Sequence, residues 1–157
     1  MMKHINITAK IDVCDYAELS PQDKSTVDAA KEATQTAYAP YSRFQVGVAV
    51  RLVDGTIVAG NNQENAAYPS GLCAERTALF YANARYPHAA VEAIAVAAYA
   101  NGDYTDKPIT PCGACRQVIV EAQSRYKHPI RMILYGKKEV YLVAQITDLM
   151  PLAFAEF

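Results

Sequence analysis

Residues 46–60 read Val-Gly-Val-Ala-Val-Arg-Leu-Val-Asp-Gly-Thr-Ile-Val-Ala-Gly, and this stretch decides the fold class. Large apolar side chains occupy every second position of residues 46–52, which is the period of a β-strand. The dipeptide Asp54-Gly55 that follows is typical of a two-residue hairpin turn. We therefore expect residues 56–60 to return as a second strand, antiparallel to the first.

Helices and further strands are predicted on both sides of this hairpin. Ser20 and Pro21 are typical of a helix start, because serine caps the helix and proline suits its first position. The predicted helices are residues 21–38, 74–86, 113–125 and a short one near 148–154, and the further strands are 91–98, 130–135 and 140–143. This order predicts an α/β fold: a single three-layer domain with a mixed five-stranded sheet and helices on both faces.

Length and composition limit the classes of function. The chain has 157 residues, of which 52% are hydrophobic and 20% charged, enough for one domain with a sizeable core. We expect residues 1–20 to be an N-terminal extension and residues 21–157 to be that domain. A net charge of -1 and the lack of a long Lys/Arg run argue against nucleic acid or a membrane surface as the main partner. A small neutral ligand fits better.

The location follows from the same features. The first residues contain no apolar run long enough for a signal peptide, and no later segment is apolar enough to span a bilayer. We expect a cytoplasmic protein whose four cysteines stay reduced. A Cys-x-x-Cys pair in that setting indicates a metal or redox site rather than a disulfide.

Two short motifs supply three thiols and one carboxylate. They read Cys73-Ala74-Glu75-Arg76 and Pro111-Cys112-Gly113-Ala114-Cys115-Arg116-Gln117. Three protein ligands leave a tetrahedral zinc ion with one open position, which distinguishes a catalytic site from a structural one. Both motifs fall where a loop opens a predicted helix, and helix N-termini favour the thiolate that zinc requires. The motifs therefore predict a catalytic zinc site.

The charge of such a site needs compensation. Three thiolates make the zinc centre anionic, which opposes the ionisation of a bound water. Arg76 directly follows Glu75, and Arg116 directly follows Cys115. A guanidinium that donates to a thiolate sulfur would offset the negative charge of the centre. We expect both arginines to do so. We expect Glu75 to take the proton from the water and pass it to the leaving nitrogen.

The motifs resemble those of the small, homotetrameric, zinc-dependent cytidine deaminases of pyrimidine salvage. The resemblance extends from about residue 38 to residue 154. It rests on five blocks in order: Tyr38-Ala39-Pro40-Tyr41-Ser42-Arg43-Phe44-Gln45-Val46-Gly47, Asn62-Gln63-Glu64-Asn65-Ala66-Ala67-Tyr68-Pro69, the two cysteine motifs, and Leu149-Met150-Pro151-Leu152-Ala153-Phe154.

The resemblance implies an enzyme, a hydrolase that converts cytidine and 2'-deoxycytidine to uridine and 2'-deoxyuridine plus ammonia. In such enzymes a zinc-bound hydroxide attacks C4 of the base. The resemblance also implies one Zn2+ per subunit and a homotetramer with shared active sites. Two departures are that the first twenty residues have no counterpart in shorter family members and that Met150 replaces a usual Leu.

The family's functional positions carry over to single residues. By this resemblance the zinc ligands are Cys73, Cys112 and Cys115, and the proton shuttle is Glu75. The resemblance also implies that Asn62 and Glu64 bind the ribose 3'-hydroxyl and that Phe44 lies against the base. It implies, finally, that the backbone of Ala66 and Tyr68 completes a neighbouring subunit's site and that Phe154 reaches across an interface.

Other functions of zinc and cysteine motifs are distinguished by features of the sequence. A redox or structural-zinc module would not need Glu75, and a structural site would want a fourth ligand, whereas Cys14 lies outside both motifs. A deaminase acting on RNA or DNA should carry a basic groove. The blasticidin deaminases share Cys-Ala-Glu and Pro-Cys-Gly-x-Cys but lack the Asn-x-Glu-Asn ribose element and the Arg after Glu. The nucleotide deaminases would place a His as first ligand. The contacts assigned to Asn62 and Glu64 involve the 3'-hydroxyl and not the 2' position of the sugar. The sequence therefore indicates no preference between cytidine and deoxycytidine as substrate.

Overall fold

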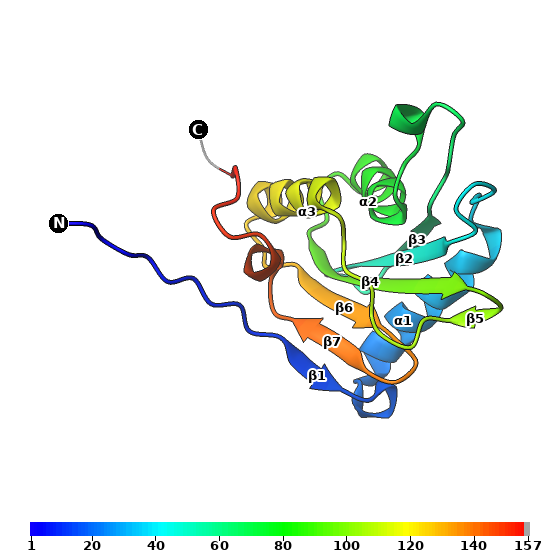
Figure 1. The fold of residues 1–157 in the computed structure, drawn as a ribbon, viewed down its shortest axis with the longest axis horizontal. Coiled ribbons are helices and arrows are strands. Elements are labelled where there is room, and N and C mark those ends of the chain that lie inside the picture. The colour runs from blue at the N-terminus through cyan, green and yellow to red at the C-terminus, as the bar shows by residue number, and fades with distance from the viewer. Residues whose placement is uncertain (156–157) are drawn as a thin grey trace.

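The hairpin predicted over residues 46–60 lies within one mixed sheet. In the computed structural model, which describes residues 1–155, β2 (Gln45–Leu52) pairs antiparallel with β3 (Ile57–Asn61) on one side and with β4 (Val91–Ala100) on the other. β4 runs parallel to β6 (Arg131–Tyr135), which pairs antiparallel with β7 (Val140–Val143). The strand order is β1-β7-β6-β4-β2-β3 (Figure 1).

Two short strands join the five that the sequence predicts. Across the described residues the sheet has seven strands, the additional ones being β1 (Asp12–Cys14), which pairs with β7, and β5 (Asp103–Tyr104), which pairs with β4. The paired segments are only two or three residues long, and pairing with a neighbouring strand sets their bounds. The predicted α/β class with a mixed sheet is confirmed. The division into an extension of residues 1–20 and a domain of residues 21–157 stays a prediction, and residues 156 and 157 lie outside the described residues.

Helices cover both faces of the sheet. On one face α1 (Pro21–Ala33) packs Val27 and Ala30 against small side chains such as Ala49 and Ala95. On the other face α2 (Ala74–Arg85) and α3 (Gly113–Tyr126) pack against a core that includes Val48, Val50 and Ile94. Successive residues of a strand point to opposite faces, so a single strand such as β2 supplies both cores.

Some predicted helix ends differ from the structure. The helix predicted over residues 21–38 ends at Ala33 and continues as a 3-10 turn over Thr34–Thr36, after which Tyr38 bridges to Gln63. The C-terminal helix predicted near 148–154 is a 3-10 turn over Ile146–Leu149. Residues 1–155 contain no helix of the length and apolar character that crossing a bilayer requires.

Two glycines let helices approach the hairpin closely. A Cβ added at Gly47 would lie 2.0 Å from the carbonyl oxygen of Ala30 in α1, on one face. A Cβ added at Gly60 would lie 2.8 Å from the backbone nitrogen of Ala78 in α2, on the other. Because α2 carries Cys73, Glu75 and Arg76 at its start, the absence of a side chain at Gly60 sets the height of that helix above the sheet.

A buried charge network holds α1 to the strands beneath it. Arg51 is 5% exposed, and its two terminal nitrogens each donate to Oδ1 of Asp23 at 3.1 Å, while its Nε donates to Glu92 Oε2 at 2.8 Å. Arg131 of β6 donates to the other oxygen of Asp23. Burial by itself raises the pKa of Asp23, but the hydrogen bonds from Arg131, Ser20 and Arg51 outweigh burial and lower it.

Candidate metal centre and active site

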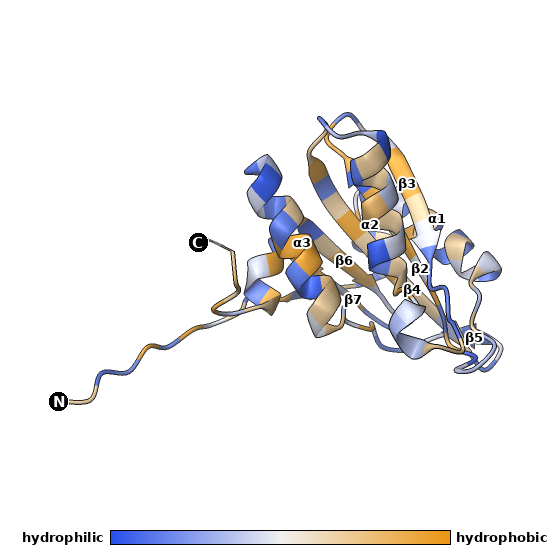
Figure 2. Ribbon diagram, turned by 90° about the horizontal axis from the view of Figure 1, so that it is seen from above, coloured by the Kyte–Doolittle hydropathy of each residue, from blue (hydrophilic) through white to orange (hydrophobic). Residues whose placement is uncertain are grey.

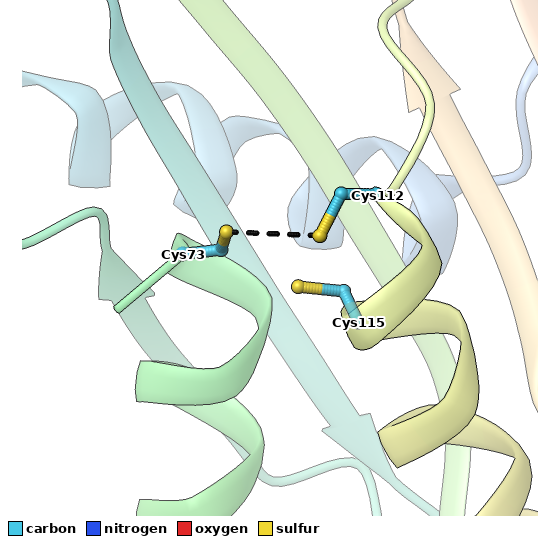
Figure 3. Close-up of side chains that lie close together, drawn as sticks. All are labelled: Cys73, Cys112 and Cys115. Atoms are coloured by element: carbon cyan, nitrogen blue, oxygen red, sulfur yellow. Dashed lines mark hydrogen bonds between the residues drawn. The ribbon is translucent and has the colours of Figure 1, made fainter. Parts of the chain in front are cut away.

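The two cysteine motifs meet where α2 and α3 begin. Cys73 is the residue before α2, Cys112 the residue before α3, and Cys115 lies in the first turn of α3. The three sulfur atoms lie within 4.8 Å of one another, and those of Cys73 and Cys112 are 3.9 Å apart. Figure 3 shows the three side chains pointing toward a common centre. Both helices cover the same face of the sheet, and this shared face brings their N-termini together.

The geometry of the three thiols fits zinc. Tetrahedral coordination with Zn–S bonds of about 2.3 Å places sulfur atoms about 3.8 Å apart. The separation between Cys73 and Cys112 agrees with this value. Cys115 is buried, Cys73 half-buried and Cys112 exposed, so that one side of the cluster is open. Within residues 1–155 this cluster consists of three ligands, which leaves a fourth tetrahedral position for a non-protein ligand.

The surroundings of Cys73 favour its thiolate. A hydrogen bond from the Cys115 thiol, together with the Arg76 guanidinium, lowers the pKa of Cys73 to about 5, although burial opposes this. The Arg76 Nη2 lies 3.6 Å from the sulfur. Cys115 is the donor in the thiol pair and is buried, and both factors raise its pKa. These surroundings therefore favour the thiolate of Cys73, which is the form that a zinc ligand takes.

Glu75 is placed beside the thiols and away from water. It is the second residue of α2 and is 5% exposed. Burial raises the pKa of its carboxyl, and the negative charge of Cys73 raises it further. A carboxyl whose pKa is moved toward neutrality can both accept and return a proton, which is what a general acid and base requires.

The two arginines do different things. Arg76 contacts the sulfur of Cys73, as expected from the sequence. Arg116 does not reach a sulfur in this structure: its Nε donates to the carbonyl oxygen of Pro111 at 2.8 Å and its Nη1 to that of Leu149 at 2.6 Å. The expected thiolate contact of Arg116 is thus replaced by contacts with the backbone carbonyls of Pro111 and Leu149. Arg116 fixes the loop before Cys112 to that segment.

A pocket of about 390 Å³ opens beside the metal centre. Cys73 and Arg76 form part of its lining, so that the pocket and the thiol cluster share a boundary. The expected ribose-binding residues Asn62 and Glu64 also line it, as does Tyr68. Residues that the sequence reasoning did not single out but that line it include Tyr41, Ser42 and Leu72. Tyr41 and Ser42 lie within residues 38–47, the first block that resembles the deaminase family, and this membership could have marked them as residues of the site.

Glu64 and Asn62 hold the rim of this pocket. Glu64 Oε2 accepts from the backbone N–H of Tyr41 at 2.9 Å and of Ser42 at 3.2 Å, and the Ser42 hydroxyl donates to Oε1. The Ser42 hydrogen bond lowers the pKa of Glu64. Asn62 Oδ1 accepts from Val46 N–H at 2.8 Å, and its Nδ2 donates to the Phe44 carbonyl at 2.9 Å. Both side chains thus order residues 41–46 in addition to facing the pocket.

The remaining expected residues lie at the edge of the site or away from it. Phe44 is half-buried, and its N–H donates to the Ser42 hydroxyl at 3.0 Å. Ala66 is exposed, and Tyr68 is 79% exposed. Phe154 is 69% exposed, and its carbonyl accepts from Gln117 of α3 at 2.7 Å. A single chain therefore brings together the thiols, Glu75, Asn62 and Glu64, but leaves the Phe154 ring on the outside.

Comparisons with known proteins agree with this arrangement. The family described as the cytidine and deoxycytidylate deaminase zinc-binding region matches residues 20–128. A zinc cofactor is thereby confirmed for the cluster of Cys73, Cys112 and Cys115, which is able to hold a metal ion. The roles of the individual site residues remain predictions.

Named relatives and a solved structure show the same likeness. The chain is 49% identical over 92 residues to the cytidine deaminase of Halalkalibacterium halodurans, covering 59% of this chain and 65% of that one, and 35% identical over 128 residues to that of Mycobacterium tuberculosis, covering 80% and 84%. The first match thus spans less than two thirds of the relative's length. The structure of cytidine deaminase from Burkholderia pseudomallei has 42% sequence identity and a TM-score of 0.71, covering 83% of this chain and 98% of that one.

Proposed function

The chain belongs to the cytidine and deoxycytidylate deaminase zinc-binding family, and from this premise we propose that it hydrolyses cytidine and 2'-deoxycytidine to the corresponding uridines and ammonia. The observation that carries the proposal is one juxtaposition. The three-thiol centre, with the buried Glu75 two residues from Cys73, adjoins through Cys73 a pocket that Asn62 and Glu64 also line. A nucleoside needs such a pairing, because its base must meet the reacting groups while its sugar is held a few ångströms away.

Cys73, Cys112 and Cys115 would hold the zinc ion. Zinc supplies Lewis acidity that makes water nucleophilic near neutral pH. Arg76 keeps the Cys73 sulfur ionised and offsets part of the negative charge that three thiolates bring together. This compensation acts from one side of the cluster, because Arg116 is engaged with backbone carbonyls.

Glu75 moves the proton. Its carboxylate accepts a proton from the attacking water and delivers it to the amino nitrogen that leaves the base as ammonia. Its burial supports both halves of this transfer, since a carboxyl with a raised pKa holds the proton long enough to hand it on. Its place in the first turn of α2, two residues after Cys73, keeps it beside the thiol centre.

Asn62 and Glu64 bind and orient the sugar. Glu64 is already anchored by the N–H groups of Tyr41 and Ser42, so its carboxylate needs little reordering when a ribose hydroxyl arrives. One N–H of the Asn62 amide is used by Phe44, and the other is available to a ligand. These contacts concern the 3'-hydroxyl, so the proposal includes both cytidine and 2'-deoxycytidine.

We place the reaction in pyrimidine salvage in the cytoplasm and in a homotetramer with shared active sites. The exposed positions of Ala66, Tyr68 and Phe154 on the surface of one chain support sharing, because a residue that completes a neighbouring subunit's pocket must lie at the surface of its own chain. An active monomer in sedimentation at assay concentrations would contradict this part of the proposal.

A substrate panel and one variant test the function. Ammonia release is measured with cytosine, cytidine, 2'-deoxycytidine, 2'-deoxycytidylate and blasticidin S. The proposal expects turnover of the two nucleosides and little of the others; preferred turnover of the nucleotide or of blasticidin S would reassign the substrate. Glu75→Gln should lower kcat roughly 100- to 10,000-fold while zinc content and nucleoside binding persist. Glu121→Gln, at an exposed position of α3, is the matched control and should remain active.

A further inference from the structure

The N-terminal arm, residues 1–13, whose last two residues belong to β1, has a feature that the deaminase site does not use. From Ile5 to Val13 the chain alternates strictly between apolar and polar residues, reading Ile-Asn-Ile-Thr-Ala-Lys-Ile-Asp-Val. This is the pattern of a β-strand with one apolar face. Figure 2 shows apolar and polar colours alternating along the arm, and Figure 1 shows the arm extending away from the body beyond β1.

The arm's apolar face is not buried within one chain. The exposed fractions are 84% for Ile5, 51% for Ile7, 43% for Ile11 and 58% for Val13. The ladder between β1 and β7 covers only Asp12 to Cys14, because β7 ends at Val143 and the chain then turns into the 3-10 helix. A strand pattern nine residues long is thus paired over its last part only.

The arm also continues an open sheet edge. Among the described residues β1 is the last strand on its side of the sheet, so its outer N–H and C=O groups face away from β7. Open edges of this kind are where a further strand adds, and natural proteins usually blunt them with charge, proline or a covering segment. Residues 5–13 contain no proline, and their two charged residues, Lys10 and Asp12, have opposite signs and lie on one face. The other face of the arm therefore carries no charge that would keep a further strand away.

We propose that this arm is an interaction surface for a second copy of the same chain, in which residues 5–13 of the two copies pair antiparallel across a two-fold axis at Ala9. In this register Ile5 lies opposite Val13 and Ile7 opposite Ile11, so every apolar residue of one arm meets an apolar residue of the other. The strand of each copy also covers the open edge of β1 in the other. The proposal is independent of the deaminase activity.

The charges fit the same register. Two residues beyond each end of the ladder, Lys3 of one copy lies opposite Asp15 of the other. The symmetry makes this pair occur twice. Within the ladder Lys10 meets Thr8 and Asp12 meets Asn6, so no two like charges are directly opposed. Opposite-charge and apolar cross-strand pairs each favour such a pairing, whereas directly opposed like charges disfavour it. A two-fold pairing needs this self-complementarity, because any contact between residue i of one copy and residue j of the other also occurs between j of the first copy and i of the second.

Disulfide cross-linking of the full-length protein tests the register. Only a residue on the two-fold axis meets its own copy, so Ala9→Cys should form a covalent dimer under mild oxidation. The Ile7→Cys and Ile11→Cys proteins should each fail to self-link, because four residues at about 3.4 Å each separate the equivalent positions. A mixture of these two variants should link to each other. Mass spectrometry of the linked peptides separates these bonds from bonds to the native cysteines.

The outcomes are distinct. Linking of Ala9→Cys together with linking of the mixture, but of neither control alone, supports the pairing. Equal linking by all three single variants would indicate random collision of flexible arms and would overturn it, as would no linking at all.

A second measurement does not depend on thiols. Ile7→Asp places a charge on the apolar face of the arm, and Thr8→Asp places the same charge one residue away on the polar face. Amide hydrogen exchange of residues 5–11 should be slow in the wild type and in Thr8→Asp and fast in Ile7→Asp, because pairing protects these backbone N–H groups. Equal exchange in the two variants would overturn the proposal. If the arm instead bound lipid, its exchange in the wild type would slow only after phosphatidylcholine vesicles are added, and that result also overturns it.

Discussion

Removal of the Asp23 charge tests the electrostatic anchor of α1. In Asp23→Asn the side chain keeps its shape but loses the charge that pairs with both terminal nitrogens of Arg51 and with Arg131. Breaking a buried ion pair from one side typically costs about 3 to 5 kcal/mol, because the other charge stays buried. Arg51 keeps Glu92 and Thr26 as partners, so we expect the lower end, about 3 kcal/mol. For a chain of this size that is a fall in Tm of roughly 6 to 12 °C.

The pH dependence gives this prediction a second, independent part. The folded-state pKa of Asp23 lies below its unfolded value of about 3.9. Its contribution to stability is therefore fully present above that value and is lost as the pH falls through the folded-state pKa. The difference in unfolding free energy between wild type and Asp23→Asn should be largest at pH 6 to 7 and should shrink below about pH 4.

Urea unfolding between pH 3 and pH 7 measures both parts. Glu32→Gln removes one negative charge from an exposed position of the same helix and is the matched control, with an expected change within about 0.5 kcal/mol. A loss below 1 kcal/mol at pH 7, or a difference that does not change with pH, would show that the network does not hold α1 as described.

Three further predictions concern the site. Cys73→Ala, Cys112→Ala and Cys115→Ala should each lose zinc as measured by metal analysis, whereas Cys14→Ala should keep it; one zinc per chain in any of the first three would remove that cysteine from the ligand set. Gly60→Ala should cost about 1 to 3 kcal/mol of stability and weaken zinc binding, because the added methyl pushes against the α2 backbone. Gly113→Ala, where an added Cβ meets nothing within 4 Å, should do neither, and equal effects of the two would contradict this packing. Glu64→Ala should lower kcat/KM for cytidine roughly 5- to 150-fold, from the loss of a hydrogen bond worth about 1 to 3 kcal/mol; unchanged steady-state kinetics would exclude a role in binding the sugar.

The sequence by itself determined the class of the fold and the chemistry of the metal site. The alternation of residues 46–52 and the turn at Asp54-Gly55 are local signals, and β2 and β3 form there. The number, spacing and type of ligands in the two cysteine motifs are likewise set within a few residues, because helix N-termini and adjacent thiols act over one turn. Glu75 could be singled out for the same reason, since it lies two residues from Cys73.

Only the tertiary structure decided which groups those side chains meet. Arg76 directly follows Glu75 and Arg116 directly follows Cys115, yet one contacts a sulfur and the other the carbonyl of Leu149, thirty-three residues away. The strands β1 and β5 are only as long as their pairing with β7 and β4, and no local pattern sets that length. The anchoring of Glu64 by Tyr41 and Ser42 likewise joins segments more than twenty residues apart. Such contacts depend on long-range packing, whose geometry a local pattern of residues does not contain.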